Sequence, residues 1–295
     1  MRTALEGVKK RLVASNVTTC CPPGCHGNVT FDTIHTLPDS RSVEPSIVSL
    51  SIQMSDEMSS PTALKDDLCD RLTHVIGRIN AAAVRAGRPP GEITLISISK
   101  THSSDRIGMA IDCGATDIGE NRLQEAEPKI IEVGRDRVRW HLVGHLQANK
   151  ARKAVKLFDV IHSLDSIALA QRLDRICSEE QRDELPVLVQ VNLGDEETKS
   201  GVDESVVFDL VEAVGKCERL QLIGLMSVPP YFEDPQQVRP FFARLRQLRD
   251  QLKSRGSFGG GVGELSMGMT HDFEVAIEEG ATMVRIGTAI FGERL

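Results

Sequence analysis

Eight short apolar segments recur along this chain, and stretches with helical periodicity separate most of them. The segments span residues 93–99, 117–121, 139–144, 160–164, 187–192, 220–226, 264–267 and 283–287. Short apolar runs bounded by polar loops are typical of buried strands. Strands that alternate with helices pair in parallel, and eight such units predict an α/β fold with one closed (β/α)8 barrel, a TIM barrel.

The helical segments and the length of the chain support this barrel. Apolar residues recur at helical spacing over 64–83 and 238–252, and a short helix is expected at about 104–113. Residues 62–295 therefore form the predicted barrel domain, whose length suits a fold of about 250 residues. The alternative is an open doubly wound sheet, but the glycine-rich fingerprint that usually follows an early strand of that fold is missing.

Residues 1–61 differ from the rest of the sequence. They have no sustained periodicity and are rich in Ser, Thr, Pro and Gly, so we expect an unstructured extension. Met54 and Met58 precede the barrel closely, which leaves open that the start is assigned too early. Basic residues near Met1 leave a targeting segment as a further alternative.

Composition excludes several classes of function. The net charge is −7, so no general basic field attracts nucleic acid or an anionic membrane. No apolar run approaches the roughly 20 residues that span a bilayer. With one Trp, one Tyr and nine Phe, platforms that stack on single-stranded nucleic acid are not expected.

The seven cysteines form two groups. One group is scattered singly through helical stretches, which predicts small buried apolar residues of a reducing compartment and hence a cytoplasmic protein; it comprises Cys69, Cys113, Cys177 and Cys217. The other group lies within 20–26, next to His26, with no second ligand pair at a zinc-like spacing. We therefore predict no metal site.

Lys100 directly follows the first apolar run. At the end of a strand, a lysine often just reaches the surface. If it is buried instead, burial lowers the pKa of an ammonium group and makes the amine a nucleophile that can form a Schiff base with an aldehyde. The surroundings of the other strand ends favour this second interpretation.

Polar residues and glycines follow other predicted strands. In such barrels the chemistry lies at the carboxyl ends of the strands, and the last two loops commonly hold a phosphate group. Glycines and hydroxyl groups there can donate to an oxyanion, and an arginine can bind phosphate or face a ring nitrogen. The candidate cofactor-binding residues are Lys100, Asn121, Ser266, Met267, Gly268, Arg285, Gly287 and Thr288, with Lys199 as a second candidate lysine. A lysine that lies opposite glycine and hydroxyl donors for a phosphate group suits pyridoxal 5′-phosphate (PLP), which has both an aldehyde and a phosphate.

His141 and His145 are spaced four residues apart and would face the same way on a strand. A metal pair is conceivable, but no third ligand is apparent. Packing or pocket lining is the preferred interpretation.

Several motifs in this order resemble the pyridoxal phosphate homeostasis protein family; they lie at 97–101, 119–121, 140–147, 224–226, 265–269 and 284–288. The resemblance covers residues 62–295. It implies a barrel like the N-terminal domain of alanine racemase (the fold type III barrel), PLP on Lys100, and its phosphate near Ser266, Gly268, Gly287 and Thr288. It also implies that Asn121 and Arg285 contact the cofactor and that Lys199 takes part in cofactor handling.

Two functions remain open. The first is a PLP-binding carrier or regulator in intracellular PLP homeostasis, which would supply apo PLP-dependent enzymes. The second is a PLP-dependent amino-acid racemase or related enzyme. A racemase needs an acid–base group on each face of its substrate. The only tyrosine, Tyr231, lies in a loop, and no second domain follows the eighth strand, so we expect a monomeric carrier without turnover.

Overall fold

The computed structural model describes residues 61–194 and 200–293. Residues 1–60 of the predicted extension lie outside this part, as do the cysteine group within 20–26 and Lys199. The first described helix, α2, spans Pro61–Arg85.

All eight predicted strands are present. They are β1 (Thr94–Ile98), β2 (Asp117–Glu120), β3 (Arg139–Leu142), β4 (Val160–Leu164), β5 (Leu185–Asn192), β7 (Leu220–Met226), β8 (Glu264–Met269) and β9 (Met283–Ile286). Each strand pairs in parallel with its neighbours, β1 pairs with β9, and β4 pairs with β5, so the sheet closes on itself. The predicted closed parallel barrel is therefore confirmed, and the open sheet is excluded.

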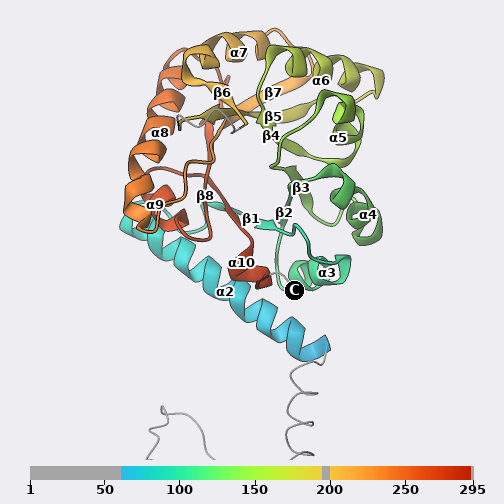
Figure 1. The fold of residues 1–295 in the computed structure, drawn as a ribbon, viewed down its shortest axis with the longest axis vertical. Coiled ribbons are helices and arrows are strands. Elements are labelled where there is room, and N and C mark those ends of the chain that lie inside the picture. Colours follow the sequence, from blue (N-terminus) through green and yellow to red (C-terminus); the bar gives the residue numbers. More distant parts are fainter. Residues whose placement is uncertain (1–60, 195–199, 294–295) are drawn as a thin grey trace, which may run out of the picture. The chain divides into compact units, whose positions relative to one another are not determined.

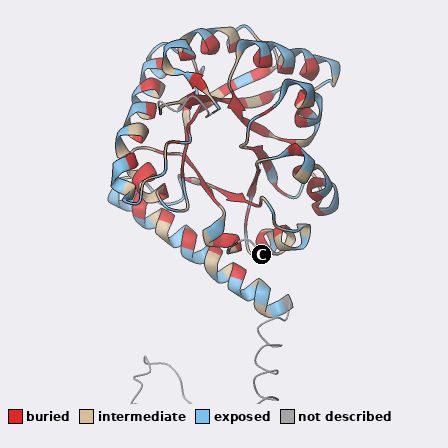
Figure 2. Ribbon diagram, viewed as in Figure 1, coloured by how far each residue is buried: buried red, intermediate tan, exposed pale blue. Residues whose placement is uncertain are grey.

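Helices surround the barrel (Figure 1). After α2 they are α3 (Ser104–Asp112), α4 (Leu123–Val133), α5 (Ala151–Leu157), α6 (Ile167–Glu179), α7 (Val207–Val214), α8 (Arg239–Ser254), α9 (Phe273–Glu278) and α10 (Thr288–Phe291). Their buried faces turn toward the strands and their exposed faces turn outward (Figure 2). This pattern follows from the helical spacing of apolar residues, which gives each helix one apolar side.

Side chains alternate along each strand between two cores. The larger core lies between the strands and the helices, and includes Trp140, Leu265 and Met267. A smaller core consists of Ile96, Ile98, Val160, Leu188, Met226 and Met283, which come from five different strands. In a closed barrel the helices cover the outer face of the sheet, and the inner faces of all strands meet in the middle. This second cluster therefore fills the barrel interior.

Two features were not predicted. A two-residue strand, β6 (Val202–Asp203), pairs with the end of β5. A disulfide joins Cys69 on α2 to Cys113 after α3, with a Cα–Cα distance of 5.1 Å. The prediction that these two cysteines are buried thiols was therefore wrong, because two helices far apart in the sequence pack side by side. Cys177 is buried and free, as predicted, and Cys217 is free but half-buried.

The two histidines at four-residue spacing do not face the same way. His141 on β3 is wholly buried, whereas His145 follows the end of the strand and has a side chain that is 50% exposed. No group of three or more His, Cys, Asp or Glu side chains in the described residues is arranged to hold a metal ion. Within the same part of the chain, no helix has the length and apolar character needed to cross a membrane.

Candidate functional site

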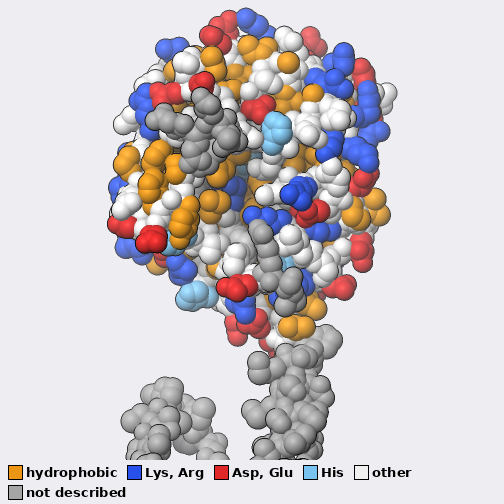
Figure 3. Space-filling view, viewed as in Figure 1, with side chains coloured by type: hydrophobic (Ala, Val, Ile, Leu, Met, Phe, Trp, Pro, Cys, Tyr) orange, Lys and Arg blue, Asp and Glu red, His pale blue; other side chains and the backbone are white. Residues whose placement is uncertain are grey.

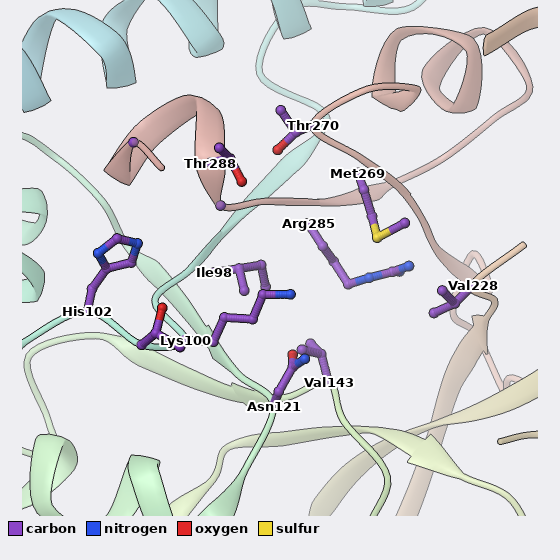
Figure 4. Close-up of a pocket in the computed structure, with 13 residues that line it drawn as sticks. Ile98, Lys100, His102, Asn121, Val143, Val228, Met269, Thr270, Arg285 and Thr288 are labelled. Carbon is purple, nitrogen blue, oxygen red and sulfur yellow. The ribbon is translucent and has the colours of Figure 1, made fainter. Parts of the chain in front are cut away.

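A cavity of about 370 Å³ lies beside the carboxyl ends of several barrel strands. Its size suits a small molecule. It is lined by Ile98, Lys100, Thr101, His102, Asn121, Val143, Val228, Met269, Thr270, Arg285, Gly287, Thr288 and Gly292. Five of the nine predicted residues are among them: Lys100, Asn121, Arg285, Gly287 and Thr288. In the close-up, the Lys100 amine extends into the space between Asn121, Ile98 and Arg285 (Figure 4).

Lys100 enters the cavity because of the alternation along β1. Ile96 and Ile98 face the barrel interior, and Lys100 continues this row two residues after the strand ends. The next residue, Thr101, has φ 68°, a left-handed conformation that is rare for a β-branched residue. Its N–H donates to Glu125 at 3.3 Å, which helps to hold this turn. The chain therefore turns sharply just after Lys100.

A buried network lies behind the Lys100 strand end, on the helix side. The Lys129 ammonium donates to Glu120 Oε1 at 2.6 Å and to the Ser99 carbonyl at 2.8 Å. The Ser99 hydroxyl donates to the same Glu120 oxygen at 2.6 Å. Burial raises the pKa of Glu120, although the hydrogen bonds from Lys129 and Ser99 oppose this. The network joins α4 to the residues that directly precede Lys100 and Asn121.

Arg285 on β9 reaches the cavity from the barrel interior. Its side chain is buried, and it donates to the Ser266 hydroxyl at 2.7 Å and to the Ser227 carbonyl at 2.8 Å. Burial lowers its pKa to about 10, so the group still carries its charge at neutral pH. Among the described residues no carboxylate forms an ion pair with Arg285. A buried cation in such a position favours a ligand that carries negative charge or acceptor atoms.

The end of β8 and the turn that follows bring Met269 and Thr270 to the cavity. Gly268 has φ 91°, and a Cβ atom there would lie 2.6 Å from the Ala276 Cβ on α9. The Met269 N–H donates to Asp272 Oδ1 at 2.6 Å, which closes the turn. Figure 4 shows the side chains of Thr270 and Thr288 on the same side of the cavity. Gly268 thus shapes the cavity wall through its backbone, although it does not line it.

The side chains of Ser266 and Met267 lie on opposite faces of β8. Met267 is wholly buried in the core between barrel and helices. The Ser266 hydroxyl lies in the barrel interior, where it contacts His162 Nδ1 at 2.9 Å and Arg285. Neither residue lines the cavity. Met267 faces the helices because alternate residues of β8 point to opposite faces of the sheet, and the Ser266 hydroxyl is occupied by His162 and Arg285. That both residues belong to the cofactor site, with Ser266 near the phosphate, stays a prediction.

Thr270, Glu120, Lys129 and His162 were missed from the sequence. Thr270 follows directly on the predicted glycine-rich loop, so a longer loop would have included it. Alternation along 117–121 indicates that Glu120 and Asn121 face opposite sides of the sheet. Nothing in the sequence indicates that Lys129, on a later helix, is the partner of Glu120. His162 lies inside a predicted strand, and only the barrel closure brings it to Ser266.

The space-filling view shows the molecule from the same side as Figure 1, and histidine and basic side chains occur close to the middle of this face (Figure 3). Acidic side chains are interspersed with them. This mixed surface agrees with the absence of a general basic field in the sequence.

The chain is similar in sequence and in fold to known proteins. The chain matches the alanine racemase N-terminal domain family over residues 78–295. It is 42% identical over 226 residues to the pyridoxal phosphate homeostasis protein of Aquifex aeolicus, covering 77% of this chain and 98% of that one. The chain belongs to the pyridoxal phosphate homeostasis protein family. The Escherichia coli K12 member is 40% identical over 242 residues, covering 78% of this chain and 97% of that protein.

A solved structure supports the same family. PipY of Synechococcus elongatus, in a structure with PLP bound, is 36% identical, with a TM-score of 0.66. The match covers 76% of this chain and all of that chain. The likeness therefore extends over the barrel that carries the cavity.

Proposed function

We propose that this protein binds PLP in the cavity at the barrel end and acts in intracellular PLP homeostasis. The observation that carries this proposal is the joint presence of Lys100, the buried Arg285 cation and the threonines Thr270 and Thr288 around one cavity. The membership in a family with a PLP-bound structure, PipY, supports it. When bound, PLP supplies a reactive aldehyde and an electron-withdrawing ring.

The residues present fit such a group. The Lys100 amine can condense with the aldehyde carbon to a Schiff base, with loss of one water molecule. Thr270, Gly287 and Thr288 can donate to phosphate oxygens, and Asn121 and Arg285 can contact the ring. Gly287 lets the end of β9 lie close to β1, since a Cβ there would lie 3.1 Å from the Ile98 carbonyl oxygen.

The decisive experiment is a visible absorption spectrum of the purified protein with PLP, followed by borohydride reduction and peptide mapping. We expect a yellow protein with a reduced pyridoxyl adduct on Lys100. Lys100→Ala should lose the adduct, and Lys150→Ala, which changes a lysine at an adjoining hollow, should keep it. A colourless wild-type protein without an adduct would refute the proposal. An additional adduct on Lys199 would support the sequence prediction of a second reactive lysine.

We further propose a carrier and not an enzyme. Tyr231, the residue considered as an acid–base partner, is 74% exposed, and its ring lies against His271 with centroids 5.3 Å apart. It does not line the cavity. An amino-acid racemisation assay should show no turnover, and transfer of PLP to an apo PLP-dependent enzyme should occur. Turnover that disappears in Lys100→Ala would instead establish an enzyme.

The remaining expectations belong to this proposal as well. We propose a monomer, with residues 62–295 as the PLP-binding domain and residues 1–61 as an extension. The proposal that it works in the cytoplasm rests on the free Cys177 and Cys217 alone, because the Cys69–Cys113 disulfide removes the other two thiols from that argument. Size-exclusion chromatography with light scattering tests the first point. The mass of the mature protein isolated from its source tests whether the extension is retained.

A further inference from the structure

A continuous chain of hydrogen bonds crosses the barrel interior and ends at Arg285. His141 Nε2 lies 2.8 Å from Asp117 Oδ1, and His141 Nδ1 lies 2.9 Å from His162 Nε2. His162 Nδ1 lies 2.9 Å from the Ser266 hydroxyl, which accepts from Arg285 Nη1 at 2.7 Å. The five residues come from β2, β3, β4, β8 and β9. Both histidines and Ser266 are wholly buried.

With one proton on each imidazole, the donors and acceptors of this chain permit one direction only. A carboxylate can only accept, so His141 donates to Asp117 through Nε2 and accepts through Nδ1. His162 must then donate through Nε2 and accept through Nδ1. The Ser266 hydroxyl therefore gives its proton to His162 and offers its oxygen to Arg285. Each imidazole carries one proton, and every contact has one donor and one acceptor.

The charge states agree with this direction. Burial would raise the pKa of Asp117, but the hydrogen bonds from His141 and Thr116 hold it below the usual value, so the carboxylate is ionised. Burial lowers the pKa of both His141 and His162. A second proton on His162 would require it to donate to Ser266, whose own hydroxyl proton would then lose its acceptor.

This direction matters for Arg285. Its guanidinium is held at two points, by the Ser266 oxygen and by the Ser227 carbonyl. While His162 takes the serine proton, the hydroxyl is held with a lone pair of its oxygen toward Arg285. Without His162 the hydroxyl can rotate, and one of the two acceptors that hold the guanidinium is no longer fixed.

We propose that Asp117, His141, His162 and Ser266 act as a positioning relay that holds the Arg285 guanidinium at the cavity. This inference rests on the proposed function, since it assumes that PLP is the ligand that Arg285 meets. None of these four side chains lines the cavity. A guanidinium can only donate hydrogen bonds. A cofactor ring next to the fixed Arg285 side chain therefore lies beside a hydrogen-bond donor and a positive charge. The relay therefore tunes both the affinity for PLP and its absorption spectrum.

The test uses the full-length protein with PLP itself as the probe. Ser266→Ala removes the acceptor for Arg285, and His162→Leu removes the acceptor for the serine proton. We expect each to weaken PLP binding about tenfold, the effect of losing one well-placed hydrogen bond to a charged group. The visible band of bound PLP should also shift or change shape. Circular dichroism verifies that each variant is folded.

Two variants separate positioning from packing. His162→Gln retains one donor and one acceptor, so it should keep the direction of the chain and bind PLP within about twofold of wild type. Thr282→Val removes the hydroxyl that accepts from the Leu265 N–H between β8 and β9, away from the relay. It should leave the affinity and the spectrum unchanged.

The outcomes distinguish the two proposals. If wild type forms the Lys100 adduct but Ser266→Ala keeps wild-type affinity and spectrum, the relay is refuted while PLP binding stands. If His162→Gln is as impaired as His162→Leu, a packing role replaces the positioning role. If wild type forms no adduct, the proposed function itself fails. Should His162→Leu not fold, Ser266→Ala alone decides.

Discussion

Gly268 is the residue beside the cavity whose backbone most restricts replacement. Its φ of 91° is one that residues with a Cβ rarely adopt. In addition, the missing Cβ would lie 2.6 Å from the Ala276 Cβ and 2.9 Å from the Phe273 Cα. Because α9 packs directly on the turn that carries Met269 and Thr270, the turn cannot move outward to relieve a clash.

Gly268→Ala is expected to lower the free energy of unfolding by about 2–4 kcal/mol, through backbone strain and overpacking together. The measurement is urea unfolding followed by circular dichroism. Gly108→Ala is the matched control, because nothing lies within 4 Å of the corresponding Cβ position on α3. It should stabilise by up to about 1 kcal/mol. Equal losses in both variants would contradict this account.

At the level of elements, a buried ion pair joins α4 to β1 and β2 below Lys100. The Lys129 and Glu120 side chains are only 11% and 0% exposed, and they share the Ser99 hydroxyl and carbonyl as further partners. Breaking a buried pair by removing one partner is far costlier than replacing both, since one charge is left without a partner.

Lys129→Met should therefore destabilise the protein by about 3–5 kcal/mol. The double variant Lys129→Met with Glu120→Gln should recover part of this loss, because the unpaired buried carboxylate is removed. A double-mutant cycle from urea unfolding measures the coupling. Additive effects of the two changes would show that the pair does not act as a unit.

The disulfide is the second link between elements, and it joins α2 to α3. A cross-link that closes a loop of this length, 44 residues, stabilises by about 3–4 kcal/mol when it forms. Reduction should lower the midpoint of thermal unfolding, and a variant with Cys69→Ser and Cys113→Ser should not respond to a reductant. Alkylation of Cys69 in the non-reduced, denatured protein would contradict the pairing.

At the scale of the whole molecule, the barrel interior holds an apolar cluster and a polar layer together. His141 and His162 lie in that layer with pKa values below their ordinary value of 6.5. Below about pH 6.5 the unfolded chain binds protons at these residues while the folded barrel does not. Stability is therefore lost as the pH falls.

In wild type the free energy of unfolding decreases as the pH falls below about 6.5. His162→Gln should make this decrease smaller by up to about 1.4 kcal/mol per pH unit, since one titrating group is removed. The measurement is urea unfolding at pH values between 7.5 and 5. His145→Gln is the control, because His145 has a side chain that is 50% exposed. If His162→Gln loses stability with falling pH as steeply as wild type, other groups cause that loss.

Much of the barrel was predictable because it depends on local patterns. The eight apolar segments agree with the eight barrel strands, and their order with helices requires parallel pairing. Lys100, Asn121, Arg285, Gly287 and Thr288 were predictable as cavity residues, since the carboxyl ends of parallel strands meet at one end of a barrel. Strand alternation also contains the signal that Met267 faces away from the interior.

The sequence by itself thus determined the barrel, the family and five of the residues that line the cavity, because strand alternation and strand ends are properties of neighbouring residues. Only the tertiary structure decided the partners of Ser266, Glu120 and Cys69. His162 lies 104 residues from Ser266 along the chain, and Cys113 lies 44 residues from Cys69. Such partners are chosen by the closure of the barrel and by the packing of helices around it, because a buried polar group takes whichever partner the fold brings within hydrogen-bond distance.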